Sequence, residues 1–111
     1  MPLINISTNK EIPNEQMLLV KSSEFISSLL KKPESFVMVK LTDSLQMIFS
    51  GTNEPCCFIE IRSIGSIESS KMSKPICEFF SSELEISRKR IYILFQDVES
   101  NMWAWNSRTF G

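Results

Sequence analysis

The chain has 111 residues, of which 42% are hydrophobic and 23% charged, and its twelve basic and thirteen acidic side chains leave a net charge of −1. This length predicts one globular domain with a single modest core, and the balanced charge disfavours nucleic-acid binding, which requires a sizeable basic surface. Histidine is absent, which excludes the commonest general base and most zinc sites, so no metal site is predicted and an enzymatic base would be an amine, a carboxylate or a tyrosine.

The first predicted element is a strand over residues 2–8, where Leu3, Asn5 and Ser7 alternate with Ile4, Ile6 and Thr8. Its first residue is chemically interesting, because removal of Met1 in front of the small Pro2 leaves a secondary amine on a buried strand. Removal from water disfavours a charged amine, so its pKa falls and it can act as a base on a carbon next to a carbonyl. The alternative is that Pro2 is an ordinary second residue at the start of an edge strand.

A helix is predicted next, after a turn at residues 10–14. Pro13 lies in its first turn and the helix runs to about Lys31. Lys31 and Lys32 suit the negative end of the helix dipole, and Pro33 ends the helix. The predicted inward stripe is Leu18, Ser22, Phe25, Ile26, Leu29 and Leu30.

The remaining elements repeat this order. The sequence predicts a strand at 36–41 with a hairpin extension at 46–49, a loop at 51–55, a strand at 56–64, a helix from about Ser73 to Ile86, and a strand at 90–95.

An internal repeat supports this assignment. Glu24-Phe25-Ile26-Ser27-Ser28 recurs as Glu78-Phe79-Phe80-Ser81-Ser82, 54 positions later. Two β-α-β units, roughly 1–54 and 55–111, are therefore expected within one domain of the α/β (α+β) class, forming a four-stranded mixed sheet with two helices on one face. The same offset aligns Pro2 with Cys56, Ile4 with Phe58, Leu30 with Leu84, Val37 with Ile91 and Val39 with Ile93.

The second face of this sheet requires a cover. Residues 56–59 and 91–95 are nearly continuous apolar runs, which is typical of strands buried on both faces. Because the helices cover only one face, a second copy of the chain is the expected cover. The tail over residues 98–111 has no regular period but contains Trp103, Trp105 and Phe110, so we expect it to dock on a neighbouring subunit or to line a pocket.

The cysteines and the terminus indicate the compartment. Cys56, Cys57 and Cys77 form no even disulfide framework and are predicted to be reduced core residues. No apolar run approaches a membrane span, and the N-terminal residues lack a signal-peptide pattern, so a cytoplasmic protein without membrane partners is expected.

Short motifs along nearly the whole chain resemble one known family. They are Met1-Pro2, Lys32-Pro33, Gly51 with Glu54-Pro55-Cys56, Ser63-Ile64-Gly65, Ile86-Ser87 with Arg90-Ile91-Tyr92, and Trp105-Asn106-Ser107 with Thr109-Phe110. In order and spacing they resemble the macrophage migration inhibitory factor (MIF) family of the tautomerase superfamily. Only the segment between Ile67 and Lys74 looks a few residues shorter than in animal members.

The resemblance implies a homotrimer whose three sheets face inwards, with active sites between subunits. It also implies that the processed N-terminal proline, here Pro2, is the catalytic base in keto–enol tautomerisation of phenylpyruvate and dopachrome-like compounds. The expected small-molecule partner is therefore an aromatic 2-keto acid, and no cofactor is implied.

The resemblance assigns further roles by position. Lys32 matches a lysine that pairs with the substrate carboxylate, and Ile64 a residue whose backbone amide contacts substrate. Tyr92 matches a tyrosine that a neighbouring subunit contributes, whereas Trp105 and Phe110 match aromatic residues of the pocket wall. Without the family, the favoured reading is a solvated helix-end lysine for Lys32 and core or strand residues for the other positions.

Four departures from the family pattern affect the expected chemistry. Leu94 and Phe36 stand where animal members have an asparagine and a tyrosine, so weaker or shifted substrate preference is expected. Trp103 replaces a small aliphatic residue at the pocket mouth and is expected to narrow it. Ile59 replaces the second cysteine of a Cys-x-x-Cys beginning at Cys56, so thiol-oxidoreductase activity is not expected.

Two functions remain open at this point. The first is a trimeric tautomerase, and the second is a cytokine-like binding protein that acts on a protein receptor or client and keeps a residual tautomerase pocket. Retention of Met1 would make the Pro2 nitrogen an amide without basicity. Export without a signal peptide also remains open, because exported family members lack one.

Overall fold

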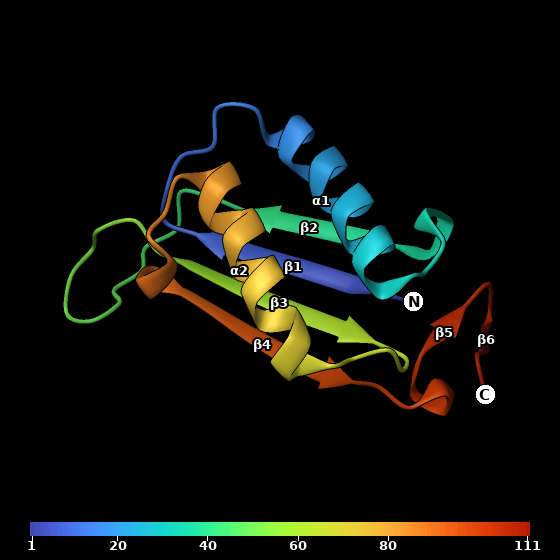
Figure 1. Ribbon diagram of the computed structural model, residues 1–111. Coiled ribbons are helices and arrows are strands. Elements are labelled where there is room, and N and C mark those ends of the chain that lie inside the picture. The colour runs from blue at the N-terminus through green and yellow to red at the C-terminus, as the bar shows by residue number, and fades with distance from the viewer.

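The computed structural model describes residues 1–111 and contains one four-stranded sheet with two helices packed on one of its faces (Figure 1). The main elements are β1 (Leu3–Thr8), α1 (Glu15–Leu30), β2 (Met38–Thr42), β3 (Cys57–Ser63), α2 (Ser69–Leu84) and β4 (Ile91–Asp97). The strand order is β2-β1-β3-β4, with β1 parallel to β2, antiparallel to β3, and β3 parallel to β4. The predicted mixed sheet is confirmed. Neither helix has the length and apolar character needed to cross a membrane.

Helix α1 begins and ends at identifiable caps. The Asn14 side chain accepts a hydrogen bond from the Met17 N–H at 3.1 Å, which satisfies one of the free amides of the first turn. Lys31 adopts a left-handed conformation at φ 54° and its N–H bonds the Ser27 carbonyl. The predicted position of Pro13 in the first turn of the helix is wrong: Pro13 precedes the cap, because the Asn14 side chain caps the helix. The predicted stripe is confirmed, with Leu18, Ser22, Ile26 and Leu30 buried and Phe25 and Leu29 packed beside them.

The two helices keep the 54-residue offset, since α1 spans Glu15–Leu30 and α2 spans Ser69–Leu84. The predicted start of the second helix near Ser73 is wrong, since α2 begins at Ser69. Pro75 consequently lies inside α2 and not in its first turn. The first strands do not keep this offset. Ile4 faces the helices, as Ile59 does in the second unit, whereas Phe58 is only partly buried. The alignment of Ile4 with Phe58 is wrong by one residue, because the loop at 64–68 is one residue shorter than that at 9–14.

Two other boundaries differ from the sequence prediction. Strand β2 begins at Met38, because Pro33 is followed by a 3₁₀ turn over Glu34–Phe36. No strand forms at residues 46–49; there is only an isolated bridge between Phe49 and Thr52. Arg90 contributes to the shape of this loop, because its guanidinium donates to the carbonyls of Thr52, Glu54 and Pro55.

The core lies between the sheet and the helices. Its completely buried residues are Ile4, Ile6, Ile26, Ile59, Ile61, Ile76 and Phe80. Phe25 of α1 and Phe79 of α2 stack on one another with ring centroids 4.1 Å apart, so the helices contact each other through equivalent positions of the two units.

The opposite face of the sheet has no cover within the chain (Figure 1). At its centre Asn5 donates to Glu60 at 3.0 Å, and Arg62 forms an ion pair with the same carboxylate at 3.0 Å. Tyr92 and Leu94 on β4 are 64% and 43% exposed. The chain alone therefore leaves large apolar side chains in solvent beside a polar network, and the covering copy stays a prediction.

The C-terminal tail is more regular than predicted. After a 3₁₀ turn at Ser100–Met102, β5 (Ala104–Trp105) and β6 (Arg108–Thr109) form a small hairpin near the chain's N-terminus (Figure 1). Asn106 and Ser107 both have positive φ angles, 51° and 73°, as two-residue hairpin turns require. Strands of two residues are too short to show alternation, which explains why the sequence pattern did not reveal them.

Candidate active site

A largely apolar pocket lies where β1 begins. Its volume is about 280 Å³ and its lining residues are Met1, Pro2, Leu3, Phe36, Met38, Trp103, Ala104, Trp105 and Phe110. Three regions distant in sequence supply them: the N-terminus, the turn leading into β2, and the C-terminal hairpin. Of the predicted site residues, the structure thus brings together Pro2, Phe36, Trp103, Trp105 and Phe110.

Pro2 is held firmly at the inner end of the pocket. Its side chain is less than 2% exposed, and its carbonyl oxygen accepts a hydrogen bond from the Met38 N–H at 3.0 Å. Strand β1 lies between β2 and β3, so the alternative reading of Pro2 as the start of an edge strand is wrong. A proline is tolerated at the first position of a central strand, because its missing N–H removes no ladder hydrogen bond there.

The amine at the start of the chain is electrostatically perturbed. With Met1 present, the Pro2 nitrogen is an amide and the free amine belongs to Met1. Partial burial lowers the pKa of the Met1 amine, and the positive charge of Lys32 lowers it further. Removal of Met1 would transfer the amine to Pro2, which lies deeper in the same environment.

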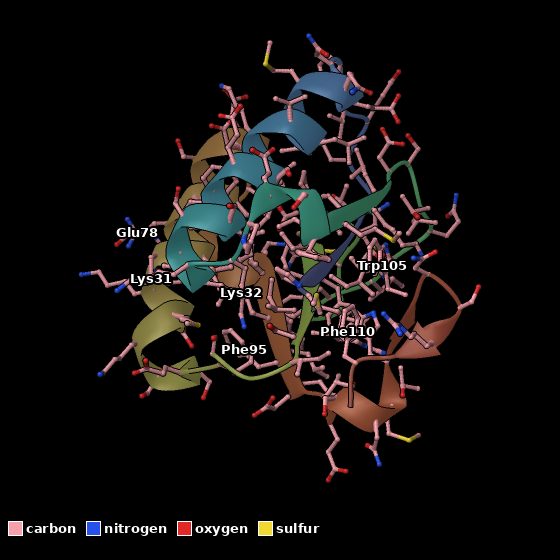
Figure 2. The ribbon with its side chains drawn as sticks, turned by 90° about the vertical axis from the view of Figure 1, so that its right-hand side faces the viewer. Lys31, Lys32, Glu78, Phe95, Trp105 and Phe110 are labelled. Atoms are coloured by element: carbon pink, nitrogen blue, oxygen red, sulfur yellow. The ribbon has the colours of Figure 1, made fainter.

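Lys32 lies beside this terminus at the end of α1. Its Nζ donates a hydrogen bond to the carbonyl oxygen of Ile64 at 3.3 Å, which joins two predicted site residues, although neither lines the pocket. Figure 2 shows that the neighbouring Lys31 extends away from Trp105 and Phe110. Of the two lysines, Lys32 is the one whose charge acts on the N-terminal amine.

Three aromatic rings form one wall of the pocket. Phe36 contacts Trp105 edge-on at 5.6 Å between ring centroids and Phe110 at 6.4 Å. Trp105 and Phe110 are nearly parallel, with an interplanar angle of 7° and centroids 6.5 Å apart. We call Phe36, Trp105 and Phe110 the aromatic wall. Such a wall suits a flat, apolar ligand ring.

Tyr92 and Leu94 do not reach this pocket within their own chain. Tyr92 pairs with Phe58 in β3, which pairs with Ser7 at the far end of β1 from Pro2. Both side chains lie on the uncovered face of the sheet. Their predicted contact with substrate therefore requires another copy of the chain and stays a prediction.

Sequence reasoning missed four lining residues: Met1, Leu3, Met38 and Ala104. Met38 is the Cα partner of Leu3 in the parallel β1–β2 register, and its amide bonds Pro2. A sequence prediction that began this strand at Met38, and not at residue 36, would have placed Met38 beside the start of β1. Ala104 offered no chemical signal in the sequence.

Comparisons with known proteins agree along the whole chain. The family model described as macrophage migration inhibitory factor (MIF) matches residues 1–111. The chain is 32% identical to a macrophage migration inhibitory factor homolog of Brugia malayi, covering 100% of both, and 31% identical to macrophage migration inhibitory factor of Mus musculus, covering 99% of both. Among solved structures, a homologue from Prochlorococcus marinus has a TM-score of 0.91 at 39% identity, covering 98% of this chain and 99% of that one. The factor from Trichinella spiralis has a TM-score of 0.92 at 28% identity, with 97% and 99% covered.

Proposed function

The chain belongs to the macrophage migration inhibitory factor family, within the tautomerase superfamily, and from this premise we propose that it is a keto–enol tautomerase of small aromatic 2-keto acids such as phenylpyruvate. One observation supports this most directly. The proline that would carry the N-terminal amine is completely buried at the end of an apolar, aromatic-walled pocket, and Lys32 acts electrostatically on that terminus.

The proposed base is the secondary amine of Pro2 after removal of Met1. Its lone pair takes the proton from the carbon next to the keto group, and the C–H electron pair forms the C=C bond of the enol. The keto oxygen becomes the enol hydroxyl by taking a proton from the proline ammonium or from solvent, so no proton is gained or lost overall. Burial lowers the pKa of the amine. The amine is then uncharged, and able to accept a proton, at a lower pH than in water.

Lys32 is proposed to bind the substrate carboxylate. An ammonium group has three donors, so Nζ can keep its hydrogen bond to the Ile64 carbonyl while it pairs with a carboxylate. The substrate ring would then lie along the aromatic wall. The base, the anchor and the wall would come from different segments, so the fold fixes the position of the reacting carbon.

A homotrimer is proposed to complete the site. The family resemblance assigns Tyr92 to the site of a neighbouring subunit, and the exposure of Tyr92 and Leu94 on the uncovered sheet face agrees with such a contact. Assembly would bury these side chains and bring them to a second pocket. Activity would then depend on the oligomer.

A second candidate function is a cytokine-like binding protein with a residual pocket, acting on a protein receptor inside or outside the cell. The apolar lining favours it, because Phe36 lacks the hydroxyl of the tyrosine of animal members and the large side chain of Trp103 lines the pocket. Leu94, which lacks the amide of the animal asparagine, lies exposed on the uncovered sheet face. The two candidates differ in whether the Pro2 amine is required for the biological activity.

The decisive experiment follows phenylpyruvate enol–keto conversion by absorbance, on protein whose N-terminus has been verified by mass spectrometry. Protein with a free Pro2 should turn over, whereas Pro2→Gly should lose roughly 100-fold or more in rate with the oligomer intact. A matched control inserts one alanine before Pro2, which converts the amine to an amide and leaves every side chain in place. Absence of turnover with a free Pro2 would favour the binding protein.

A further inference from the structure

Arg108 lies on the C-terminal hairpin beside the aromatic wall. It is the direct cross-strand partner of Trp105, and strand alternation places it on the same side of the hairpin as Phe110. Together with Thr109, these residues line a second hollow of about 400 Å³. The hollow shares Trp105 and Phe110 with the Pro2 pocket, so the two hollows lie against the same pair of rings. Figure 2 shows the two labelled wall residues on neighbouring parts of the hairpin.

The guanidinium of Arg108 has no partner in the chain. The other arginines are all engaged, since Arg62 and Arg88 form ion pairs with carboxylates and Arg90 donates to three backbone carbonyls. No carboxylate lies within 4.0 Å of the Arg108 guanidinium, and none of the guanidinium N–H groups donates a hydrogen bond within the chain. A planar guanidinium presents paired donors that match the two oxygens of a carboxylate.

We propose that Arg108 is a specificity-determining residue that binds a second carboxylate, carried on the aromatic ring of the substrate. This proposal rests on the proposed tautomerase function. Lys32 would hold the 2-keto acid end near Pro2, the ring would lie on the aromatic wall, and Arg108 would hold the distal ring substituent. The preferred substrate class is then an aryl 2-keto acid with an acidic group at the far end of its ring.

The test compares phenylpyruvate with 4-carboxyphenylpyruvate, using the same enol–keto assay. The natural protein should have a KM roughly fivefold lower for the carboxylated compound, and added salt should reduce this preference. Arg108→Gln should remove the preference and leave KM and kcat for phenylpyruvate unchanged. Arg108→Lys, which keeps the charge, should retain part of it. Lys74→Gln, an equal change of charge on the exposed side of α2, should have no effect.

Failure of the inference is distinguishable from failure of the proposed function. Equal KM values for both compounds, unchanged in Arg108→Gln, would overturn the role of Arg108 and leave the tautomerase intact. If neither compound turns over, both are titrated against the fluorescence of Trp103 and Trp105, the only tryptophans in the chain. Preferential binding of the carboxylated compound that Arg108→Gln abolishes would then support Arg108 alone, whereas equal binding would refute it.

Discussion

The ammonium group of Lys32 donates a hydrogen bond to the carbonyl oxygen of Ile64, with 3.3 Å between the two atoms. This contact joins the end of α1 to the loop after β3 and fixes a positive charge near the start of β1. The same charge contributes to the lowered pKa of the N-terminal amine, after burial. Under the proposed function, Lys32 would have two separable effects, one on substrate binding and one on the pKa of the base.

Lys32→Gln should change both effects in a defined direction. Loss of the charge removes one cause of the lowered amine pKa, so the pH at which kcat/KM reaches half its maximum should move upwards. Because the uncharged amine is the base, activity should fall more at pH 6 than at pH 9. KM for phenylpyruvate should rise roughly tenfold from loss of a charged hydrogen bond. Lys32→Arg should keep the pH midpoint; a midpoint unmoved in Lys32→Gln would contradict the electrostatic role.

Leu94→Asn tests whether a second copy reaches the pocket. Leu94 is distant from Pro2 in its own chain, so an effect on substrate binding would have to arise across a subunit interface. We expect KM for phenylpyruvate to fall by roughly two- to tenfold, the value of one neutral hydrogen bond. Thr42→Asn, which introduces the same asparagine at the opposite edge of the same sheet face, is the control and should leave KM unchanged. A KM that Leu94→Asn does not alter would place Leu94 outside every active site of the assembly.

Much of the fold was predictable because it depends on local periodicity. The buried positions Leu18, Ser22, Ile26 and Leu30 follow the helical spacing, and their equivalents in α2 lie 54 residues later. The one-residue slip of the first strands was not predictable from that offset. A strand exchanges its two faces when its register moves by one residue, and only packing against the helices reveals which residues face inwards.

The site was less predictable than the fold. Pro2 and the aromatic residues of the tail were singled out by the sequence, whereas the role of Lys32 came only from the resemblance. The contact of Phe36 with Trp105 joins segments 69 residues apart and depends on a hairpin with two-residue strands. The lack of a carboxylate near Arg108 likewise appears only when its surroundings are known.

Phe80→Ala should produce the largest loss of stability among single core truncations. Phe80 is completely buried and its ring meets that of Phe79 edge-on, with centroids 5.0 Å apart. Removing it leaves a cavity under α2 and should lower the free energy of unfolding by about 3–5 kcal/mol. Urea denaturation at fixed protein concentration measures this. Val20→Ala, at a 43% exposed position of α1, is the control and should cost less than about 0.5 kcal/mol. A cost below about 1 kcal/mol for Phe80→Ala would show that the core repacks.

Alkylation should distinguish the partly exposed Cys77 from the buried Cys56 and Cys57, and it tests the expectation that the protein has no thiol-oxidoreductase activity. Burial raises the pKa of Cys57 to about 12, and the neighbouring Cys56 contributes to the same direction. At pH 8 only about one Cys57 thiol in ten thousand is then the reactive thiolate, and both Cys56 and Cys57 are shielded from reagent. Cys77 is partly exposed, so iodoacetamide should add one group to the folded protein and three after denaturation. Mass spectrometry of Cys77→Ser should then show no modification in the folded state. Rapid labelling of Cys56 or Cys57 in the folded protein would contradict their burial and reopen a redox role for this pair.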